Sequence, residues 1–599
     1  MYGNYLDDAA KIVAEKREAN LKFEHDRLTA EQKDDLLLKF HPDRIKEQFT
    51  ELKIGPNKGQ KAPIELAEML QAKPRYTADQ IDLNHVDYET DVLVIGAGGA
   101  GCSAAIMASE AGAKVLLATK LRPGDANTMM AEGGIQAADK PNDSPAQHFL
   151  DCYGGGHFDG KPELVYTLTN KAPSVIKWLN DLGVEFDKEA DGTMVTTHGG
   201  GTSRKRMHAC KDYSGAEIMR TLRDEALNRP DSITIVDFTA AIELIKNDKG
   251  EACGAVLMNV ETGELRIAKA KVVIIATGGA GRMHYQGFPT SNHYGATADG
   301  LVIAYRAGAK LLYQDSLQYH PTGAAYPTQI LGKLVTEKVR SLGAKLINKD
   351  GEVYIHPLET RDVNASGIIR EVREGRGVEN DVQPAVWLDT PMIEMIHGEG
   401  TILKSIPAMY NMFIKYGIDI RKEPILVYPT LHYQNGGVEI NATCHTNVAN
   451  LLVAGEASGG VHGTNRLMGN SLLDVVVFGR EAGIEAGKMF KKIKQTETAK
   501  MTLKHVTEFE KERAAAKIKG DAVSPKVLPT YTHGNTEFEK AIPGASTCPV
   551  KKAAAPKAAP AKKAAAKPAA KKAAAKPAAK KPAAKAPAKK APAKKTAKK

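Results

Sequence analysis

The stretch DVLVIGAGGAGCSAAIMASEAG at residues 91–112 decides the fold. It begins with an apolar run typical of a buried strand, passes through closely spaced glycines, and continues with small residues that favour a tightly packed helix. A second apolar run, VLLAT at 115–119, follows directly. Strand, glycine turn, helix and strand in this order begin a βαβ unit, so we predict an α/β fold of the Rossmann type.

The glycines of this turn have the spacing G-x-G-x-x-G, at Gly96, Gly98 and Gly101. The first permits a tight turn, the second lets the backbone approach a pyrophosphate, and the third lets the helix pack closely on the strand. The helix N-terminus then faces the phosphates. We therefore predict a dinucleotide site. Thr119 and Lys120 stand where an acidic residue usually grips the ribose, which argues against NAD.

The charge of the chain is divided unevenly. The net charge is +11, yet residues 551–599 hold 18 lysines and no acidic residue, and subtracting them leaves −7 for the rest. This stretch repeats Ala, Lys and Pro and has no large apolar residue that could build a core. We expect a disordered tail, either simply solvated or in contact with a polyanion through counterion release.

The cysteines and the apolar runs indicate the cellular compartment in which the protein works. No two cysteines form a C-x-x-C pair, so we expect no metal site, no cluster and no disulfide framework, and a reducing cytoplasm. The charged start of the chain is unlike a secretory signal, and apolar runs such as 272–276 are too short to cross a bilayer. We expect a cytoplasmic protein, or one peripheral at the inner face of the membrane, with membrane contact only through a partner.

The first 88 residues are rich in charged and helix-forming residues, with apolar positions three and four apart, as in IELAEML at 64–70. This pattern predicts a helical extension. Within it, Phe40-His41-Pro42-Asp43 resembles the loop of a J-domain. The turn GPNKG at 55–59 arrives too soon for the second helix of such a domain, so we interpret the match as chance.

Further short motifs follow the glycine turn: DANTMMAEGGI at 125–135, ATGG at 276–279, TADG at 297–300, Gly455-Glu456 and Asn470-Ser471-Leu472. Together with Thr119-Lys120 after the second strand, these motifs resemble the FAD-contacting segments of the flavoprotein subunits of succinate dehydrogenase and fumarate reductase. The resemblance covers about two-thirds of the chain and implies FAD as the cofactor. It assigns to FAD the residues Gly96, Gly98, Gly101, Thr119, Lys120, Asn127, Ala131, Gly133, Gly134, Ala276, Thr277, Gly278, Asp299, Glu456, Asn470, Ser471 and Leu472.

Asn127 departs from the family pattern. Respiratory members carry a histidine at this place and attach FAD to it covalently, and an amide cannot form that bond. The resemblance therefore implies noncovalent FAD, as in soluble fumarate reductases and L-aspartate oxidase.

The family also guides the division of these 599 residues into domains. We predict an α/β chain in which a Rossmann-type FAD-binding domain carries an inserted α+β capping domain. The predicted limits are 1–88 for the helical N-terminal extension, 89–313 with 432–492 for the FAD-binding domain, 314–431 for the capping domain, 493–548 for a short C-terminal segment, and 549–599 for the disordered basic tail rich in Lys, Ala and Pro.

Five polar motifs predict a site for a small dianion. A four-carbon dicarboxylate brings two negative charges into a pocket that excludes water, so the pocket must supply fixed cations and donors. The chain offers QYHPTG at 318–323, TEKVR at 336–340, RD at 361–362, HY at 432–433 and GTNRL at 463–467. In this order they resemble the family's active-site segments. They imply an enzyme that interconverts fumarate and succinate, or a close dicarboxylate or enoate.

The resemblance divides substrate binding between two pairs of residues. His320 and Thr336 would hold one carboxylate, and His432 and Arg466 would bind and twist the other. The guanidinium fork of Arg466 suits a carboxylate better than a lysine would.

Arg361 takes the place of the family's catalytic acid, which protonates one olefinic carbon while flavin N5 delivers a hydride to the other. Because an arginine has a pKa above 12, it can act in this way only if a relay restores its proton. Glu337 and Arg340 match that relay in the family.

Two other classes of function stay open. Arg206, His208 and Gly215, in the segment 198–215, look more like L-aspartate oxidase, so the alternative is an L-aspartate oxidase-like amino-acid oxidase that passes electrons to oxygen. A noncatalytic flavoprotein that binds nucleic acid through its tail is the third class. The acidic charge outside the tail argues against it.

The electrons must come from a separate source, because the chain shows neither a haem motif nor cluster ligands. We expect an iron–sulfur redox partner subunit. In membrane-bound relatives a longer helical C-terminal domain docks that subunit, whereas here only a short segment separates Arg480 from the lysine tail. We expect the N-terminal extension to supply the missing docking surface.

Overall fold

The glycine turn joins strand β4 (Tyr88–Ile95) to helix α4 (Gly99–Glu110) in a computed structural model that describes residues 4–529. The predicted basic tail lies outside the described residues. Two glycines of the turn are required by close contact. A Cβ at Gly96 would lie 2.4 Å from the carbonyl oxygen of Ala276, and one at Gly101 would lie 1.7 Å from the oxygen of Gly96. The turn is therefore built as its spacing predicts.

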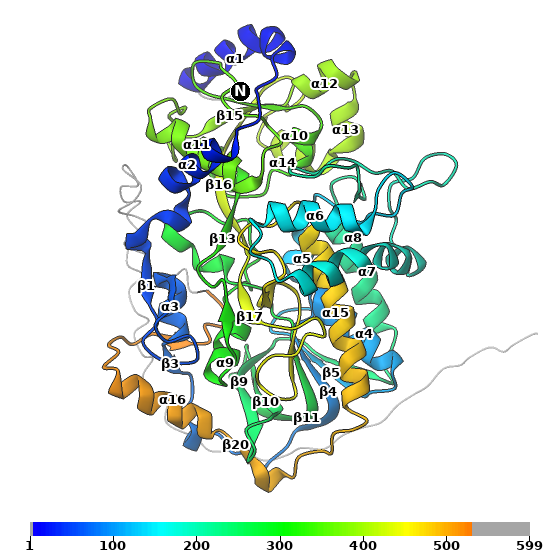
Figure 1. The fold of residues 1–599 in the computed structure, drawn as a ribbon, viewed down its shortest axis with the longest axis vertical. Coiled ribbons are helices and arrows are strands. Elements are labelled where there is room, and N and C mark those ends of the chain that lie inside the picture. The colour runs from blue at the N-terminus through cyan, green and yellow to red at the C-terminus, as the bar shows by residue number, and fades with distance from the viewer. Residues whose placement is uncertain (1–3, 530–599) are drawn as a thin grey trace, which may run out of the picture. The chain divides into compact units, whose positions relative to one another are not determined.

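Strand β4 is central in the main sheet, between β11 (Leu265–Ile275) and β5 (Val115–Ala118) (Figure 1). All three are parallel, as are β8 (Ile233–Val236) next to β5 and β18 (Leu451–Val453) next to the end of β11. An antiparallel extension continues from β11 through β10 (Ala252–Asn259), β9 (Thr239–Asn247) and β20 (Met501–Thr502). The predicted α/β class is thus confirmed.

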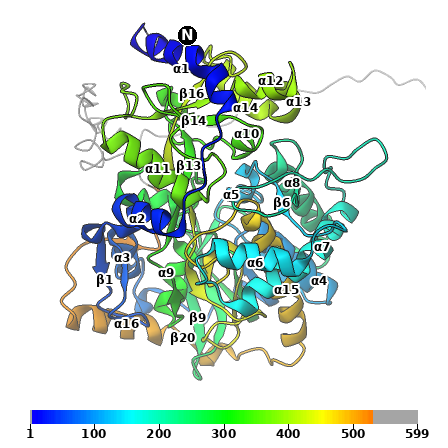
Figure 2. The same ribbon diagram turned by 45° about the horizontal axis from the view of Figure 1, so that its top comes forward.

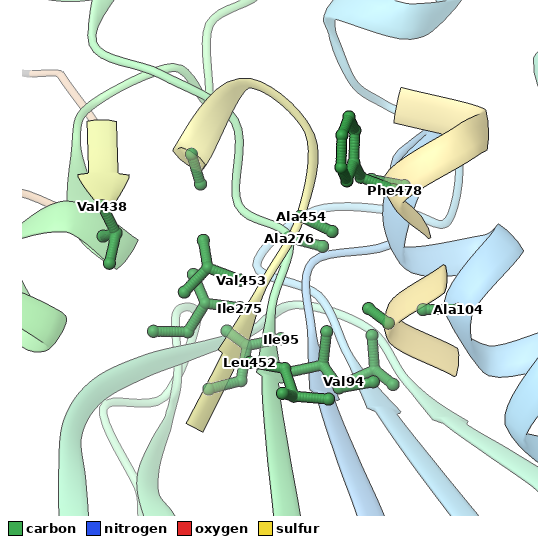
Figure 3. Packing of buried hydrophobic residues seen from close by; sticks show 14 of the residues in the cluster. Val94, Ile95, Ala104, Ile275, Ala276, Val438, Leu452, Val453, Ala454 and Phe478 are labelled. Atoms are coloured by element: carbon green, nitrogen blue, oxygen red, sulfur yellow. The ribbon is translucent and has the colours of Figure 1, made fainter. Parts of the chain in front are cut away.

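Two helices of small residues pack on each other beside this sheet. Cβ atoms at Gly479 and Gly483 of α15 (Asn470–Met489) would lie 2.6 Å and 2.3 Å from backbone oxygens of α4. The helices can approach this closely because glycine and alanine occupy the contact. Figure 3 shows the adjoining core, where Ile95, Ile275 and Val453 come from three neighbouring strands. Their burial fixes the C-terminal ends of the parallel strands, where ligands bind in such sheets.

A second, antiparallel sheet consists, in order, of β13 (Leu317–Ala324), β16 (Ile425–Gln434), β15 (Val386–Asp389) and β14 (Lys345–Ile347). Its core surrounds Trp387, which is fully buried. Strands β13 and β16 pair with Gln318 opposite Tyr433 and His320 opposite Thr430, so the two predicted histidine motifs become neighbours. This α+β insert contains β13 (Leu317–Ala324), α10 (Lys338–Ser341), β14 (Lys345–Ile347), α11 (Arg361–Arg373), β15 (Val386–Asp389), α12 (Met392–His397), α13 (Thr401–Ser405), α14 (Pro407–Ile414) and β16 (Ile425–Gln434).

The N-terminal segment packs against both parts of the molecule. Helices α1 (Asn4–Lys22) and α2 (Ala30–Phe40), dark blue in Figure 2, lie beside the capping elements and add Leu6, Val13 and Leu37 to their core. From its composition we expected this segment to be helical throughout. It also contains short strands, and its elements after α2 are β1 (Phe49–Glu51), β2 (Lys61–Pro63), α3 (Ile64–Leu70) and β3 (Lys73–Pro74).

The end of the described chain returns to the N-terminal segment. Helix α16 (Lys504–Ala515) is followed by β21 (Val523–Ser524), which pairs in parallel with β3. Within residues 4–529 no helix combines the length and apolar character that a membrane span requires. The remaining elements are α5 (Asn127–Met130), β6 (Ile135–Gln136), α6 (Pro145–Gly155), α7 (Pro162–Asp181), β7 (Met207–His208), α8 (Ser214–Leu227), α9 (Asp299–Arg306), β12 (Leu311–Leu312), β17 (Gly437–Glu439) and β19 (Ser458–Gly459).

Candidate active site

A cavity of about 1320 Å³, its open mouth included, extends from the glycine turn to His432. Its walls come from segments far apart in the sequence, including the ends of β4, β5 and β11 and the start of α15. It thus connects the predicted phosphate turn with His432 of the predicted substrate site, whereas His320, Thr336, Arg361 and Arg466 are not among the residues that line it. The residues assigned to FAD that line it are Gly96, Gly98, Thr119, Lys120, Asn127, Ala131, Ala276, Thr277, Gly278, Asp299, Glu456, Ser471 and Leu472.

Four of the residues assigned to FAD lie behind this wall. Gly101 serves the turn itself. Cβ atoms at Gly133 and Gly134 would lie 2.6 Å from Met468 Cε and 2.3 Å from the oxygen of His208, so both are tightly packed. Asn470, the first residue of α15, donates from Nδ2 to Cys152 Sγ at 3.0 Å. These residues shape the wall instead of forming its surface.

Asn127 links separate segments of the cavity wall by hydrogen bonds. Its Nδ2 donates to Asn292 Oδ1 at 2.8 Å and to Glu456 Oε2 at 3.0 Å, while its Oδ1 accepts the backbone N–H of His293. Burial raises the pKa of Glu456, although the bond from Asn127 opposes this effect. The amide therefore fills the place of the family's histidine with a fixed hydrogen-bonding group.

Lys120 lines the cavity, but its ammonium group is fully used. Nζ donates to Asp299 Oδ2 at 2.5 Å, to the oxygen of Val527 at 2.6 Å and to Thr297 Oγ1 at 2.7 Å. An ammonium group has three donors, so none is left for a ligand. The side chain can meet FAD only through its methylene groups, and its charge instead ties the C-terminal segment to the cavity wall.

The two arginines predicted at the substrate site come together on Gln318. Its Oε1 accepts a hydrogen bond from Arg361 at 3.1 Å and another from Arg466 at 2.7 Å. Arg466 also stacks over Tyr433, with 4.5 Å from its central carbon to the ring centroid. Both guanidinium groups are almost completely buried. The fold therefore concentrates positive charge at one point, as binding a dianion requires.

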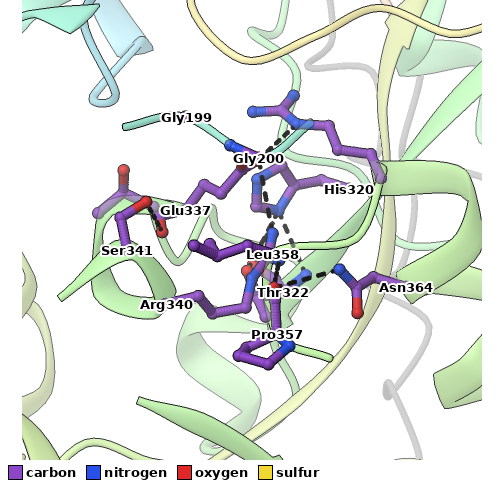
Figure 4. A network of polar contacts seen from close by, with 12 residues as sticks. Gly199, Gly200, His320, Thr322, Glu337, Arg340, Ser341, Pro357, Leu358 and Asn364 are labelled. Atoms are coloured by element: carbon purple, nitrogen blue, oxygen red, sulfur yellow. Dashed lines mark hydrogen bonds and ion pairs between the residues drawn. The ribbon is translucent and has the colours of Figure 1, made fainter. Parts of the chain in front are cut away.

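Glu337 adds a carboxylate to this cluster, and Figure 4 shows it near Gly200 and Arg340. Its Oε2 accepts from Arg361 Nε at 2.8 Å and lies 3.5 Å from Arg340, while Oε1 accepts the backbone N–H of Gly200 at 2.6 Å. Burial alone would raise the pKa of Glu337, but Arg361 and Arg340 outweigh it and hold that pKa below its usual value. The carboxylate thus contacts both arginines of the predicted relay.

The two predicted histidines face each other, with ring centroids 5.0 Å apart. His432 Nδ1 pairs with Ser291 Oγ at 2.7 Å, and among the described residues nothing bonds to His320 Nε2. Burial, and next the charge of Arg361, lower the pKa of both imidazoles well below the usual range. Both are therefore neutral near pH 7. Thr336 is buried at the start of the segment that carries Glu337.

Among the described residues, the arginine cluster has too few carboxylates to balance its positive charge. Arg361 and Arg340 both pair with the carboxylate of Glu337, whereas Arg466 forms no ion pair with a described carboxylate and feels Glu456 and Glu337 only from a greater distance. Burial, and then repulsion from Arg361, lower the pKa of Arg466 to about 9. Buried cations in excess favour an anionic ligand, because it would relieve this repulsion. The residues present therefore fit a dicarboxylate. Residues 4–529 contain no group of three or more His, Cys, Asp or Glu side chains placed to hold a metal ion.

Sequence reasoning missed four supporting residues. Gln318 and Tyr433 stand inside motifs that the resemblance had already marked, but no role was assigned to them. Gly200 belongs to the glycine run before Thr202, and a Cβ there would lie 2.3 Å from Glu337 Oε1. Ser291 comes from a segment that carried no signal.

Comparison with known proteins agrees with this geometry. The FAD binding domain family model matches residues 91–472. One subunit of the fumarate reductase (CoM/CoB) of Methanothermobacter marburgensis is 37% identical over 456 residues, 74% of this chain and 80% of that protein. The succinate dehydrogenase flavoprotein subunit of Coxiella burnetii is 34% identical, over 67% and 71% of the two chains. A variant of the E. coli quinol fumarate reductase superposes with a TM-score of 0.64 at 31% identity, over 72% and 74%.

The Rossmann-type sheet and the cavity at its C-terminal edge define an FAD-dependent oxidoreductase. The chain belongs to the family of succinate dehydrogenase and fumarate reductase flavoproteins. These relatives do not favour the alternative of an amino-acid oxidase.

Proposed function

We propose that the chain reduces fumarate to succinate, or acts on a close dicarboxylate, as the FAD-carrying subunit of a larger enzyme. The observation that supports this best is the meeting of Arg361 and Arg466 on one oxygen of Gln318, near two neutral imidazoles, of which His432 lines the cavity. Two fixed cations match a small dianion. The names of relatives as fumarate reductase and succinate dehydrogenase support the same substrate class.

The residues of the site would divide the work as follows. Arg466 and His432 bind one carboxylate, while His320 and Thr336 bind the other, and the buried surroundings exclude water. FAD, when bound, supplies the hydride that reaches one olefinic carbon. Arg361 then donates a proton to the other carbon, and the two additions convert fumarate to succinate.

Glu337 and Arg340 would restore the proton of Arg361. Glu337 is an ionised acceptor 2.8 Å from Arg361 Nε, and Arg340 lies 3.5 Å behind it. Because the acceptor contacts both guanidinium groups, a proton can pass from Arg340 through Glu337 to Arg361. Such a relay lets a group of high ordinary pKa act as an acid in each turnover.

We further infer that FAD is held without a covalent bond and receives its electrons from a separate partner, an iron–sulfur subunit in the cytoplasm or at the inner face of the membrane. Asn127 supports the first point, because its amide is already engaged with Glu456 and Asn292 and cannot form the covalent bond to flavin that a histidine forms. The relatives named as subunits support the second. Acid precipitation should release all the flavin, and flavin retained in the pellet would disprove the first point.

Anaerobic reoxidation tests the substrate. The purified holoprotein is reduced with dithionite and mixed with fumarate, with iminosuccinate or with another enoate, while flavin absorbance is followed. We expect rapid reoxidation by fumarate. An Arg361→Lys variant should lose this step by several orders of magnitude while still binding fumarate. Reoxidation by oxygen alone, with peroxide formed from L-aspartate, would instead establish the amino-acid oxidase.

A further inference from the structure

A short loop outside the predicted site touches both segments that carry the substrate arginines. It is GGGHFDG at 154–160, which consists of the last two residues of α6 and most of the connection to α7. On one side it meets the segment before Arg466. Asn465 Nδ2 donates to the oxygen of Gly155 at 2.8 Å, and Thr464 Oγ1 donates to Asp159 Oδ2 at 2.9 Å. A Cβ at Gly156 would lie 2.6 Å from the oxygen of His462, so the two segments are in close backbone contact.

On its other side the loop meets the residue after Arg361. His157 Nε2 donates to Asp362 Oδ2 at 2.6 Å, and Asp362 Oδ1 accepts the N–H of Val363 in the first turn of α11. Although burial opposes it, the hydrogen bond from His157 holds the pKa of Asp362 at about 2. This hydrogen bond therefore connects the loop to the helix that begins with Arg361.

The backbone of the loop is strained at this contact. His157 has φ 60° and Phe158 has φ 63°, a region that residues other than glycine seldom adopt. Such strain persists only where the surroundings impose it, and it gathers at functional sites. Since glycine would adopt this conformation more easily, the histidine is present for its side chain, and that side chain contacts Asp362.

We propose that the 154–160 loop positions both substrate-binding guanidinium groups, with His157 as the positioning residue for Arg361. This inference rests on the proposed function. His157 comes from the FAD-binding part and Asp362 from the α+β insert, so their bond fixes one part on the other next to the proton donor. A displacement of about 1 Å at a reacting group can cost roughly a hundredfold in rate.

Two substitutions of His157 separate the side-chain contact from the backbone. In His157→Gln the amide nitrogen can take the place of Nε2 and donate to Asp362. In His157→Asn the residue suits the left-handed backbone better, but its amide is too short to reach. We expect His157→Asn to lower kcat for fumarate by about ten- to hundredfold with little change in KM, and His157→Gln to stay within about threefold of wild type. FAD content should be unchanged in both, whereas the melting temperature should fall in His157→Asn, because the buried carboxylate of Asp362 loses its partner, and should stay at the wild-type value in His157→Gln.

Hydrogen exchange measures the positioning without any substrate. In the holoprotein, amides of 361–366 and 463–467 should exchange faster in His157→Asn than in wild type, and at the wild-type rate in His157→Gln. Wild-type exchange and kcat in a folded, flavin-loaded His157→Asn variant would overturn the inference. If wild-type protein itself failed to react with fumarate, the proposed function would fail, and the exchange data would still decide whether His157 positions α11.

Discussion

At the scale of single residues, the candidate site depends on how one carboxylate is shared. Glu337 is held by Arg361, by Arg340 and by the backbone of Gly200. Since the two arginines compete for the same anion, the position of Glu337 decides which of them it serves. The backbone contact fixes that position. A change that touches neither arginine can therefore alter proton supply.

Gly200→Ala tests this dependence. The new Cβ would lie 2.3 Å from Glu337 Oε1, so the carboxylate must shift, which disturbs the bond of its other oxygen to Arg361. We expect fumarate reduction to fall by about a hundredfold, the usual contribution of a positioned proton-transfer group, with FAD still bound. Gly199→Ala is the matched control, because the tightest contact of its Cβ is with the flexible end of Met207 at 3.0 Å, and its contacts with Met468 and Thr202 at 3.5 Å are ordinary ones. Equal activity in the two variants would show that Glu337 is not held through Gly200.

His148 provides a prediction about pH. Burial lowers the pKa of this side chain, which lies against Asn470 at the start of α15, to about 4. Its unfolded value is near 6.5, so between pH 6.5 and about 4 the unfolded chain binds a proton that the folded chain does not. The folded state is thus destabilised as the pH falls, by roughly 1.4 kcal/mol per unit.

His148→Gln should remove this slope, because an amide can still donate to Asn470 but does not titrate. We expect the variant to gain stability relative to wild type as the pH is lowered, by up to about 3 kcal/mol at pH 4. Melting temperatures of both proteins from pH 7 to 4 measure the difference. Curves that stay parallel would show that His148 is not a buried neutral imidazole.

At the scale of elements, local pattern predicts some parts of the fold and not others. The turn after β4 could be predicted, because its glycines are required within a few residues of sequence. The contact of β21 with β3 could not, since it joins residues more than four hundred positions apart and each strand has only two residues. In the same way, the motif that contains Gln318 was recognised, but the bridge that it makes depends on two distant arginines.

The segment around Val527 is a second element that sequence did not reveal. Its N–H donates to Asp299 Oδ1 at 3.0 Å and its oxygen accepts from Lys120, two residues that line the cavity where the second strand ends. The ribose of a dinucleotide lies near this strand end in Rossmann folds. Val527 also has φ 66°, which is unusual for a β-branched residue. The segment is thus held in place by the cavity wall.

Val527→Pro and Val527→Gly form a matched pair for this contact. Proline removes the donor and cannot adopt the positive φ, whereas glycine keeps the donor and adopts this φ easily. We expect FAD to dissociate about tenfold faster from Val527→Pro and at the wild-type rate from Val527→Gly, measured by the rise of free flavin fluorescence after dilution. Identical dissociation from all three proteins would show that the segment does not contribute to FAD retention.

At the scale of the whole molecule, helices α1 and α2 of the N-terminal segment contribute to the core of the capping part. Their side chains Leu6, Val13 and Leu37 are buried there. The residues His41-Pro42-Asp43 after α2 also have a structural role, since Asp43 Oδ2 accepts the N–H of Leu317 at the start of β13. The J-domain-like match therefore has a local structural role. The docking surface that we expect on this segment must lie on its outward face, because its inward face is occupied.

Arg17 forms a largely buried ion pair between the N-terminal segment and the capping part. It donates to both carboxylate oxygens of Asp389, at 2.9 Å each, and Asp389 is fully buried at the end of β15. Arg17→Met leaves that carboxylate charged and without its partner, which costs about 3–5 kcal/mol when a buried pair is broken. We expect the melting temperature to fall accordingly at pH 7.

The pH dependence of this loss identifies its cause. Burial already raises the pKa of Asp389 against the effect of Arg17, and removal of Arg17 raises it further. As the pH falls through that raised value, Asp389 takes up a proton and ceases to be a buried charge, so the deficit of Arg17→Met should shrink. Adding Asp389→Asn should restore stability at pH 7 for the same reason. A deficit that is constant with pH and is not relieved by Asp389→Asn would mean that Arg17 stabilises the capping part through packing of its methylene groups alone.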